Sequence, residues 1–154
     1  MAIFFLDSSV LVKLYVAEPG TAGILRLAAT PGARLGVSAL GALEFQVALR
    51  VRVRRGELTP DQADGMLAHF ASRASRSLFR QPLTDAVFSL AATLVDRHPL
   101  RAPDALQLAA CVAVHQTQPS ADLYFVCSDK PLLRAAAAER IPSWDPAAAE
   151  TPAP

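Results

Sequence analysis

Apolar and polar residues alternate along this chain in blocks that predict short buried strands separated by helices. Apolar runs of strand length occupy positions 3–6, 35–37, 78–83 and 123–127. Periodic apolar spacing predicts helices over 8–17, 21–29, 39–55, 60–75, 85–97, 103–117 and 131–140. Strands that alternate with helices are typical of a parallel sheet covered on both faces, so we expect an α/β fold.

Capping residues mark the ends of several predicted helices. Ser38 is a favourable N-cap for the long helix that Gly56 ends, and Thr84 is a favourable N-cap for a later helix. The segment Thr59-Pro60-Asp61-Gln62 is a capping box with proline at the first helical position. These signals indicate that the helix boundaries are encoded locally.

Glu44 stands inside the long predicted helix, where a carboxylate needs an explanation. We expect the core-facing stripe of that helix to consist of Leu40, Leu43, Val47 and Val51. Glu44 follows Leu43 directly and therefore lies at the edge of this stripe. Burying an unpaired carboxylate is costly, so the charge requires either an arginine partner or a cation, and both interpretations stay open.

Length and composition fit one globular domain, which we place at 1–146, with a disordered Pro- and Ala-rich tail at 147–154. We expect Trp144 to pin this tail to the body. The 154 residues are 52% hydrophobic, carry a net charge of +1, and contain no apolar run long enough to span a bilayer. No basic leader precedes the first strand, and Cys111 and Cys127 lack metal-ligand spacing. We therefore expect a cytoplasmic protein with reduced thiols and no membrane partner.

The basic residues are almost all arginines, and four of them crowd near the end of the long helix, at positions 50, 52, 54 and 55. Arginine binds phosphate through two parallel hydrogen bonds, which lysine cannot do. A phosphate-binding patch and a solvated helix end explain this cluster equally well.

Four acidic residues occupy positions where an α/β fold binds ligands. Asp7 and Asp129 each follow a predicted strand, Asp104 lies in the first turn of a helix, and Glu44 points from a helix. Taken singly, the three aspartates also suit helix capping or a favourable contact with the helix dipole. Ligands of parallel sheets bind beyond the carboxyl ends of the strands, so the four acids are able to meet at one edge.

Four converging carboxylates would repel one another, and a hard divalent cation would offset that repulsion. Mg²⁺ and Mn²⁺ prefer oxygen ligands and are bound by a few carboxylates together with substrate phosphate. This chemistry indicates phosphodiester hydrolysis, in which the metal activates water. The hydroxyls of Ser8, Ser9 and Ser128 lie beside these acids and are candidates for orienting a carboxylate or a water.

Four segments resemble the PIN domain, and in particular the VapC-type toxins of bacterial toxin–antitoxin pairs. They occur in the order of that family, from position 3 to about position 144, and read FFLDSSVLVKLYVAE, SALGALEFQVALRVR, LRAPDALQLAA and YFVCSDKPLLRAAA. The resemblance implies a three-layer α/β/α PIN-like fold with a parallel sheet of about five strands. It also implies endonucleolytic cleavage of RNA that depends on Mg²⁺ or Mn²⁺.

The resemblance assigns the catalytic and metal-binding roles to Asp7, Glu44, Asp104 and Asp129, with Ser9 as the supporting hydroxyl. The family often has Ser or Thr two residues before the fourth acid. Cys127 occupies that place here, and Ser128 stands one residue later.

Members of the family are usually homodimers that a small antitoxin neutralises, and this implies both kinds of partner here. Arg50 and Arg54 then become candidates for contact with RNA or with the antitoxin. The alternative function is a catalytically inactive PIN-like module that only binds RNA or protein. The presence of all four acids argues against that alternative.

Overall fold

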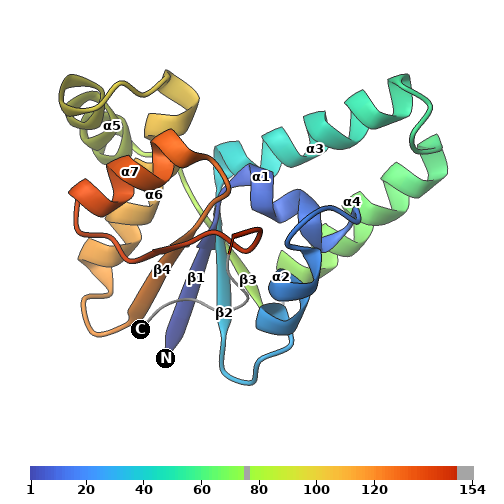
Figure 1. The fold of residues 1–154 in the computed structure, drawn as a ribbon, viewed down its shortest axis with the longest axis horizontal. Helices are drawn as coiled ribbons and strands as arrows, with labels where there is room; N and C mark the ends of the chain where they lie inside the picture. The colour runs from blue at the N-terminus through green and yellow to red at the C-terminus, as the bar shows by residue number, and fades with distance from the viewer. Residues whose placement is uncertain (75–76, 149–154) are drawn as a thin grey trace.

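A computed structural model describes residues 1–74 and 77–148, which form three layers with a parallel sheet in the middle (Figure 1). The sheet has the order β3-β2-β1-β4-β5, and every pair of neighbouring strands is parallel. Its strands are β1 (Ala2–Leu6), β2 (Arg34–Ser38), β3 (Leu78–Gln81), β4 (Asp122–Val126) and β5 (Ser143–Trp144). The expected α/β/α fold with a five-stranded parallel sheet is confirmed.

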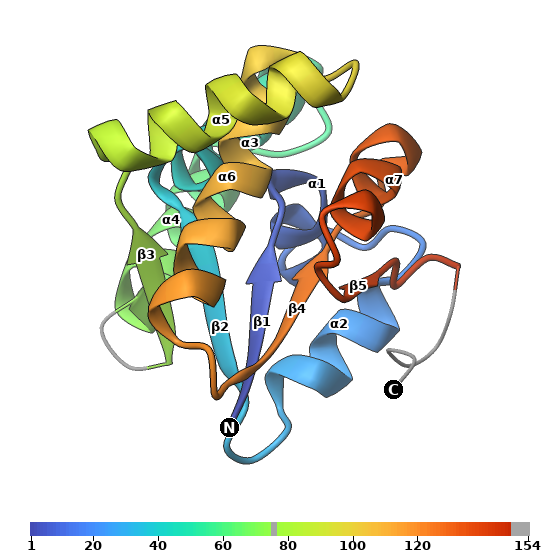
Figure 2. The ribbon, with the colours of Figure 1, turned by 90° about the vertical axis from the view of Figure 1, so that its left-hand side faces the viewer.

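Helices cover both faces of the sheet (Figure 2). One layer contains α1 (Ser8–Leu11), the 3-10 helix η1 (Val12–Leu14), α2 (Thr21–Ala28), α3 (Ala39–Arg54) and α4 (Pro60–Ala74). The other layer contains α5 (Asp85–Arg97), α6 (Ala102–Thr117) and α7 (Lys130–Ala138). Alternate residues of β1 face the two layers, so Phe4 and Leu6 join one core while Ile3 and Phe5 join the other.

The local capping signals are confirmed. The Ser38 hydroxyl accepts a hydrogen bond from the Gly41 N–H at 2.8 Å, and Thr84 caps α5 in the same way. Thr59 and Gln62 make the reciprocal bonds of a capping box, at 2.8 and 3.1 Å. Short-range hydrogen bonds therefore set these helix starts.

The predicted helix over 8–17 is shorter in the structure. It is α-helical only to Leu11, and one turn of 3-10 helix, η1, follows it. Proline at position 19 disfavours helical geometry at Glu18, so the chain must leave the helix before that point. Lys13 lies in this 3-10 turn and is buried, with only 7% of the residue exposed.

The predicted apolar stripe of the long helix is wrong. Leu43 and Val47 are 57% and 50% exposed, and the buried positions of α3 are Gly41, Phe45 and Leu49. The helix carries apolar residues on more than one side, so periodicity alone does not select the buried face. Packing selects it, because the Phe45 ring lies 4.9 Å from the Tyr15 ring and 5.2 Å from the Phe70 ring.

The end of the described chain is tied to the body through β5. Trp144 is buried, as expected, and its carbonyl accepts a hydrogen bond from the Cys127 N–H at 3.0 Å. Most of the predicted tail, 149–154, lies outside the described residues. Among the residues that are described, no helix has both the length and the apolar character needed to cross a membrane.

The corrected face of α3 predicts unequal losses of stability. Phe45→Ala should lower the free energy of unfolding by about 3–5 kcal/mol, since it opens a cavity in the core. Leu43→Ala, two positions earlier, should change it by no more than about 0.5 kcal/mol. Urea denaturation of the two variants measures the difference, and similar losses would contradict the assigned face.

Candidate active site

The candidate site lies at the carboxyl ends of β1 and β4, in the middle of the sheet. The chain after β1 proceeds to β2 on one side, whereas the chain after β4 proceeds to β5 on the other. Such a reversal of strand order opens the crevice in which α/β proteins bind ligands. Asp7 is the first residue beyond β1, and Asp129 follows the end of β4 by three positions.

Asp7 is buried and carries the most perturbed carboxyl group of the site. It is 5% exposed, caps α1, and accepts hydrogen bonds from the Ser9 N–H at 3.2 Å and the Ser9 hydroxyl at 2.6 Å. Burial raises the pKa of Asp7, and the charge of Glu44 raises it further, while the hydrogen bonds from Ser9 and Ser8 lower it. The capping interpretation of Asp7 is thus correct, but the cap leaves its charge uncompensated.

Glu44 approaches Asp7 from α3 and is held by neutral donors. The Ser8 hydroxyl donates to its Oε2 atom, and the Gln107 side-chain amide donates to the same atom at 3.3 Å. Among the described residues, no Lys, Arg or His forms an ion pair with Glu44. The arginine partner that offered an alternative explanation is therefore not observed.

Sequence reasoning missed Gln107, which links α6 to α3. Its side chain is 1% exposed, and the Ser38 hydroxyl donates to its Oε1 atom at 2.6 Å. Gly41 permits this approach, because a Cβ atom there would lie 3.2 Å from the Gln107 amide. A single polar residue inside the apolar stretch 105–111 was the available signal.

Asp104 lies one helical turn before Gln107 on α6 and therefore shares its side of the helix. Its side chain is 25% exposed and accepts a hydrogen bond from the Arg101 guanidinium at 3.3 Å. Asp104 therefore lies on the same side of α6 as Gln107, which contacts Glu44. Its own hydrogen bond comes from Arg101, three residues earlier in the chain.

Cys127 lies between Asp7 and Asp129. Its sulfur is 3.8 Å from Asp7 Oδ2 and accepts a hydrogen bond from the Asp129 N–H at 3.2 Å. Burial raises the pKa of the Cys127 thiol, and the charges of Asp7, Asp129 and Asp145 raise it further. Cys127 is consequently a neutral thiol at physiological pH. Asp129 is exposed and also caps α7, with its Oδ1 atom 2.9 Å from the Leu132 N–H.

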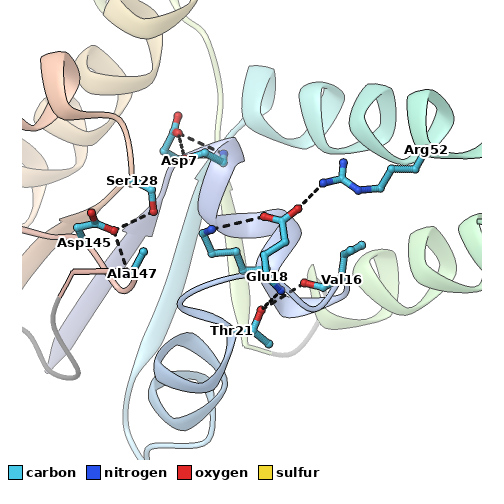
Figure 3. Close-up of polar contacts among 10 residues, drawn as sticks. Asp7, Val16, Glu18, Thr21, Arg52, Ser128, Asp145 and Ala147 are labelled. Carbon is cyan, nitrogen blue, oxygen red and sulfur yellow. Dashed lines mark hydrogen bonds and ion pairs between the residues drawn. The ribbon is translucent and has the colours of Figure 1, made fainter. Parts of the chain in front are cut away.

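Asp145 is a further acid that the sequence analysis did not select (Figure 3). It follows β5 just as Asp7 follows β1, but no strand was predicted at 143–144, so only the structure shows this position. The Ser128 hydroxyl and the Ala147 N–H both donate to Asp145 Oδ1, each at 2.9 Å. Ser128, expected to support Asp129, bonds to Asp145 instead.

Two of the predicted acids, Asp7 and Glu44, interact with each other electrostatically. The charges of Asp7 and Asp129 both act on the Cys127 thiol, as does the charge of Asp145. Within the described residues, no three His, Cys, Asp or Glu side chains are close enough together to hold a metal ion. The carboxylate oxygens of Asp7 and Glu44 nevertheless suit a hard divalent cation, because neutral hydrogen bonds leave their negative charges uncompensated.

The arginines of the long helix also have distinct environments. Arg50 pairs with Asp64 of α4 at 2.6 Å, and Arg54 is exposed. Arg52 belongs to the same arginine cluster but was not one of the two contacts selected from it. It lies two turns from Glu44, and both residues line one cavity of about 310 Å³. The spacing of Glu44, Ala48 and Arg52 at four-residue intervals was the available signal.

Several solved structures with a similar fold are toxin–antitoxin proteins. A VapBC-1 structure from nontypeable Haemophilus influenzae has a TM-score of 0.64 and 11% identity, covering 94% of this chain and 98% of that chain. VapBC2 from Rickettsia felis, bound to a DNA fragment from its promoter, has a TM-score of 0.64 and 13% identity, covering 93% and 98%. VapC20 from Mycobacterium tuberculosis, a sarcin–ricin loop cleaving toxin, has a TM-score of 0.61 and 19% identity, covering 86% and 94%.

No protein-family model and no curated protein sequence matches this chain. At these low identities, the structural likeness establishes the fold alone. The PIN-like architecture that the four sequence segments implied is confirmed on that basis.

The burial of Asp7 predicts that Asp7→Asn stabilises the metal-free protein at neutral pH. A carboxyl whose folded pKa is raised stabilises the fold fully below its usual value of 3.8, and this contribution is lost as pH rises through the folded pKa. Asparagine caps helices about as well as aspartate, so the cap is retained.

The measurement is the melting temperature in chelator from acid to neutral pH. The advantage of Asp7→Asn should grow as pH rises above 3.8, whereas the exposed Asp122→Asn at the opposite end of β4 should follow wild type. Parallel curves for Asp7→Asn and wild type would rule out an uncompensated charge at Asp7.

Proposed function

We propose that this protein is an endoribonuclease dependent on Mg²⁺ or Mn²⁺, and that it is the toxin of a type II toxin–antitoxin pair acting on RNA in the cytoplasm. The observation that carries the proposal is the buried Asp7 carboxylate beside Glu44, held by neutral groups at the strand reversal. Two adjacent carboxylates without a cationic partner suit a divalent cation, and the fold shared with VapC-type toxins supports the reaction class.

Asp7 and Glu44 would hold the cation, with Asp104 and Asp129 as further oxygen donors. A bound Mg²⁺ or Mn²⁺ supplies charge to offset the scissile phosphate and to activate a water molecule. Ser9 orients the Asp7 carboxylate, and Ser8 with Gln107 orients that of Glu44. These hydrogen bonds fix the carboxylates without removing their charge, as ligand-orienting groups do at metal sites.

The proposed partners are RNA, a second copy of the chain and a small antitoxin. Exposed apolar side chains support protein partners, and Phe88 and Val95 line a largely apolar groove of about 340 Å³ beside α5 and α6. Several structures with this fold are toxin–antitoxin complexes. Arg50 and Arg54 remain proposed contacts to RNA or to the antitoxin.

A catalytically inactive PIN-like module is the second candidate. One observation favours it, since the described residues contain no preassembled group of three metal ligands. Such a module would bind RNA or a protein partner without cleaving RNA, so a cleavage assay separates the two functions.

Wild-type protein should cleave single-stranded RNA with Mn²⁺ and lose this activity in chelator. Asp7→Asn and Glu44→Gln should each lower the cleavage rate at least ~100-fold, because each removes a charged ligand. Asp122→Asn, at the far end of the sheet, should retain wild-type activity. Folded wild-type protein that binds RNA without cleaving it in Mn²⁺ would instead support the inactive module.

Expression of the wild-type chain alone should arrest bacterial growth, whereas expression of Asp7→Asn should not. Co-expression of the cognate small protein should restore growth and yield a stable complex, since an antitoxin acts by binding the toxin. Growth rates and co-purification measure these outcomes. Normal growth with abundant, active nuclease would contradict the toxin assignment and leave the nuclease assignment intact.

A further inference from the structure

A cavity of about 310 Å³ adjoins the candidate active site and is lined by two chemically different sets of side chains. One set, Ser8, Ser9 and Glu44, belongs to the site already described. The other set, Lys13, Glu18 and Arg52, contains two cations and one acid. Figure 3 shows that Glu18 and Arg52 meet between the first helical segment and α3, apart from Asp7. We call Lys13, Glu18 and Arg52 the cationic triad.

Lys13 is a buried ammonium with a weak partner. Its side chain is 8% exposed, and its Nζ atom lies 3.4 Å from Glu18 Oε2. Strong hydrogen bonds between ammonium and carboxylate groups are about 2.7–2.9 Å long. Within the described residues, Glu18 is the only carboxylate within ion-pair distance of Lys13.

Glu18 is shared, because its Oε1 atom also accepts a hydrogen bond from the Arg52 guanidinium. One negative charge therefore serves two cations, and the triad carries a net charge of +1. Glu57 lies 3.9 Å from Arg52 but is half exposed, so solvent screens its contribution. Glu44 lines the same cavity, yet it forms no ion pair with either cation among the described residues. The triad by itself thus has one positive charge without a paired carboxylate, and the unpaired negative charge of Glu44 belongs to the other set of residues that line the cavity.

The position of Glu18 is fixed by its own loop. Its N–H donates to the Thr21 hydroxyl at 2.9 Å, and that hydroxyl donates to the Val16 carbonyl at 3.3 Å (Figure 3). Arg52 is held in turn by the Ala48 carbonyl at 3.3 Å. The two cations are therefore placed before any ligand arrives, which reduces the entropy lost on binding.

We propose that the cationic triad binds a phosphate group of the RNA that flanks the scissile phosphate. The proposal rests on the nuclease function proposed above and specifies how the substrate strand runs. A strand with its scissile phosphate near Glu44 continues along the cavity, so a neighbouring phosphate reaches Lys13 and Arg52. One phosphodiester charge neutralises the triad, and arginine with lysine is the usual combination for phosphate contacts.

Inorganic phosphate is the direct probe of this subsite. In chelator, phosphate should raise the melting temperature of wild-type protein beyond the effect of chloride at equal ionic strength, because it binds only the folded state. Arg52→Gln should lose most of this increase. Glu18→Gln should show a larger increase than wild type, since it removes the carboxylate that competes with phosphate for both cations.

Arg97→Gln is the matched control, because Arg97 also pairs with a glutamate, Glu139 at 3.2 Å, but lies in the opposite layer. It should respond to phosphate as wild type does. If Arg52→Gln and Glu18→Gln only lower stability, and phosphate affects all the proteins equally, the triad is a structural ion-pair cluster and the proposal is wrong.

RNA affinity provides the second readout. In chelator, Arg52→Gln should weaken the binding of a short single strand roughly threefold to tenfold and reduce the slope of affinity against salt concentration by about 0.7. Unchanged RNA binding with weakened antitoxin binding would assign the triad to the antitoxin and overturn the proposal. Phosphate binding with the expected variant pattern, but without RNA cleavage by wild type, would retain the subsite and reject the nuclease function.

Discussion

The Asp7 N–H donates a hydrogen bond to the Val126 carbonyl at 2.9 Å, and the arrangement of the site depends on this bond. It extends the parallel pairing of β1 with β4 one residue beyond the end of β1. The first acid is thereby fixed beside the last residue of the neighbouring strand. Because Cys127 follows Val126 directly and Asp129 follows it by three positions, the same sheet geometry brings both close to Asp7.

The groups around the acids orient them without neutralising them. Hydroxyls, an amide and a thiol contact Asp7 and Glu44, and each of these groups is uncharged. A lysine or arginine in these positions would stabilise the protein more and would compete with a cation. The repulsion between Asp7 and Glu44 lowers the stability of the folded protein, and functional sites often lower stability in this way. The buried Lys13 and the partly exposed Arg52 are instead placed around Glu18, in the other set of residues that line the cavity.

Helices from both layers contribute residues to the site. Asp7 lies between β1 and α1, and Glu44 lies in α3 of one layer. Helix α6 of the other layer contributes Gln107 and Asp104. The helices α3 and α6 contact each other, and Gly41 of α3 lets the Gln107 side chain approach. The hydrogen bonds from Ser38 to Gln107 and from Gln107 to Glu44 then connect the end of β2 to the site. The position of Glu44 consequently depends on the packing of both layers.

The sequence by itself determined the order and type of the elements, because capping residues and apolar runs act over a few positions. It also placed Asp7 directly after a strand, because the apolar run before it is a local pattern. Only the tertiary structure decided which face of α3 is buried, since α3 is apolar on several sides and the rings around Phe45 select one of them. The partners of Glu44, Ser128 and Arg52 were likewise decided by contacts between residues 17 to 63 positions apart, which no local pattern encodes.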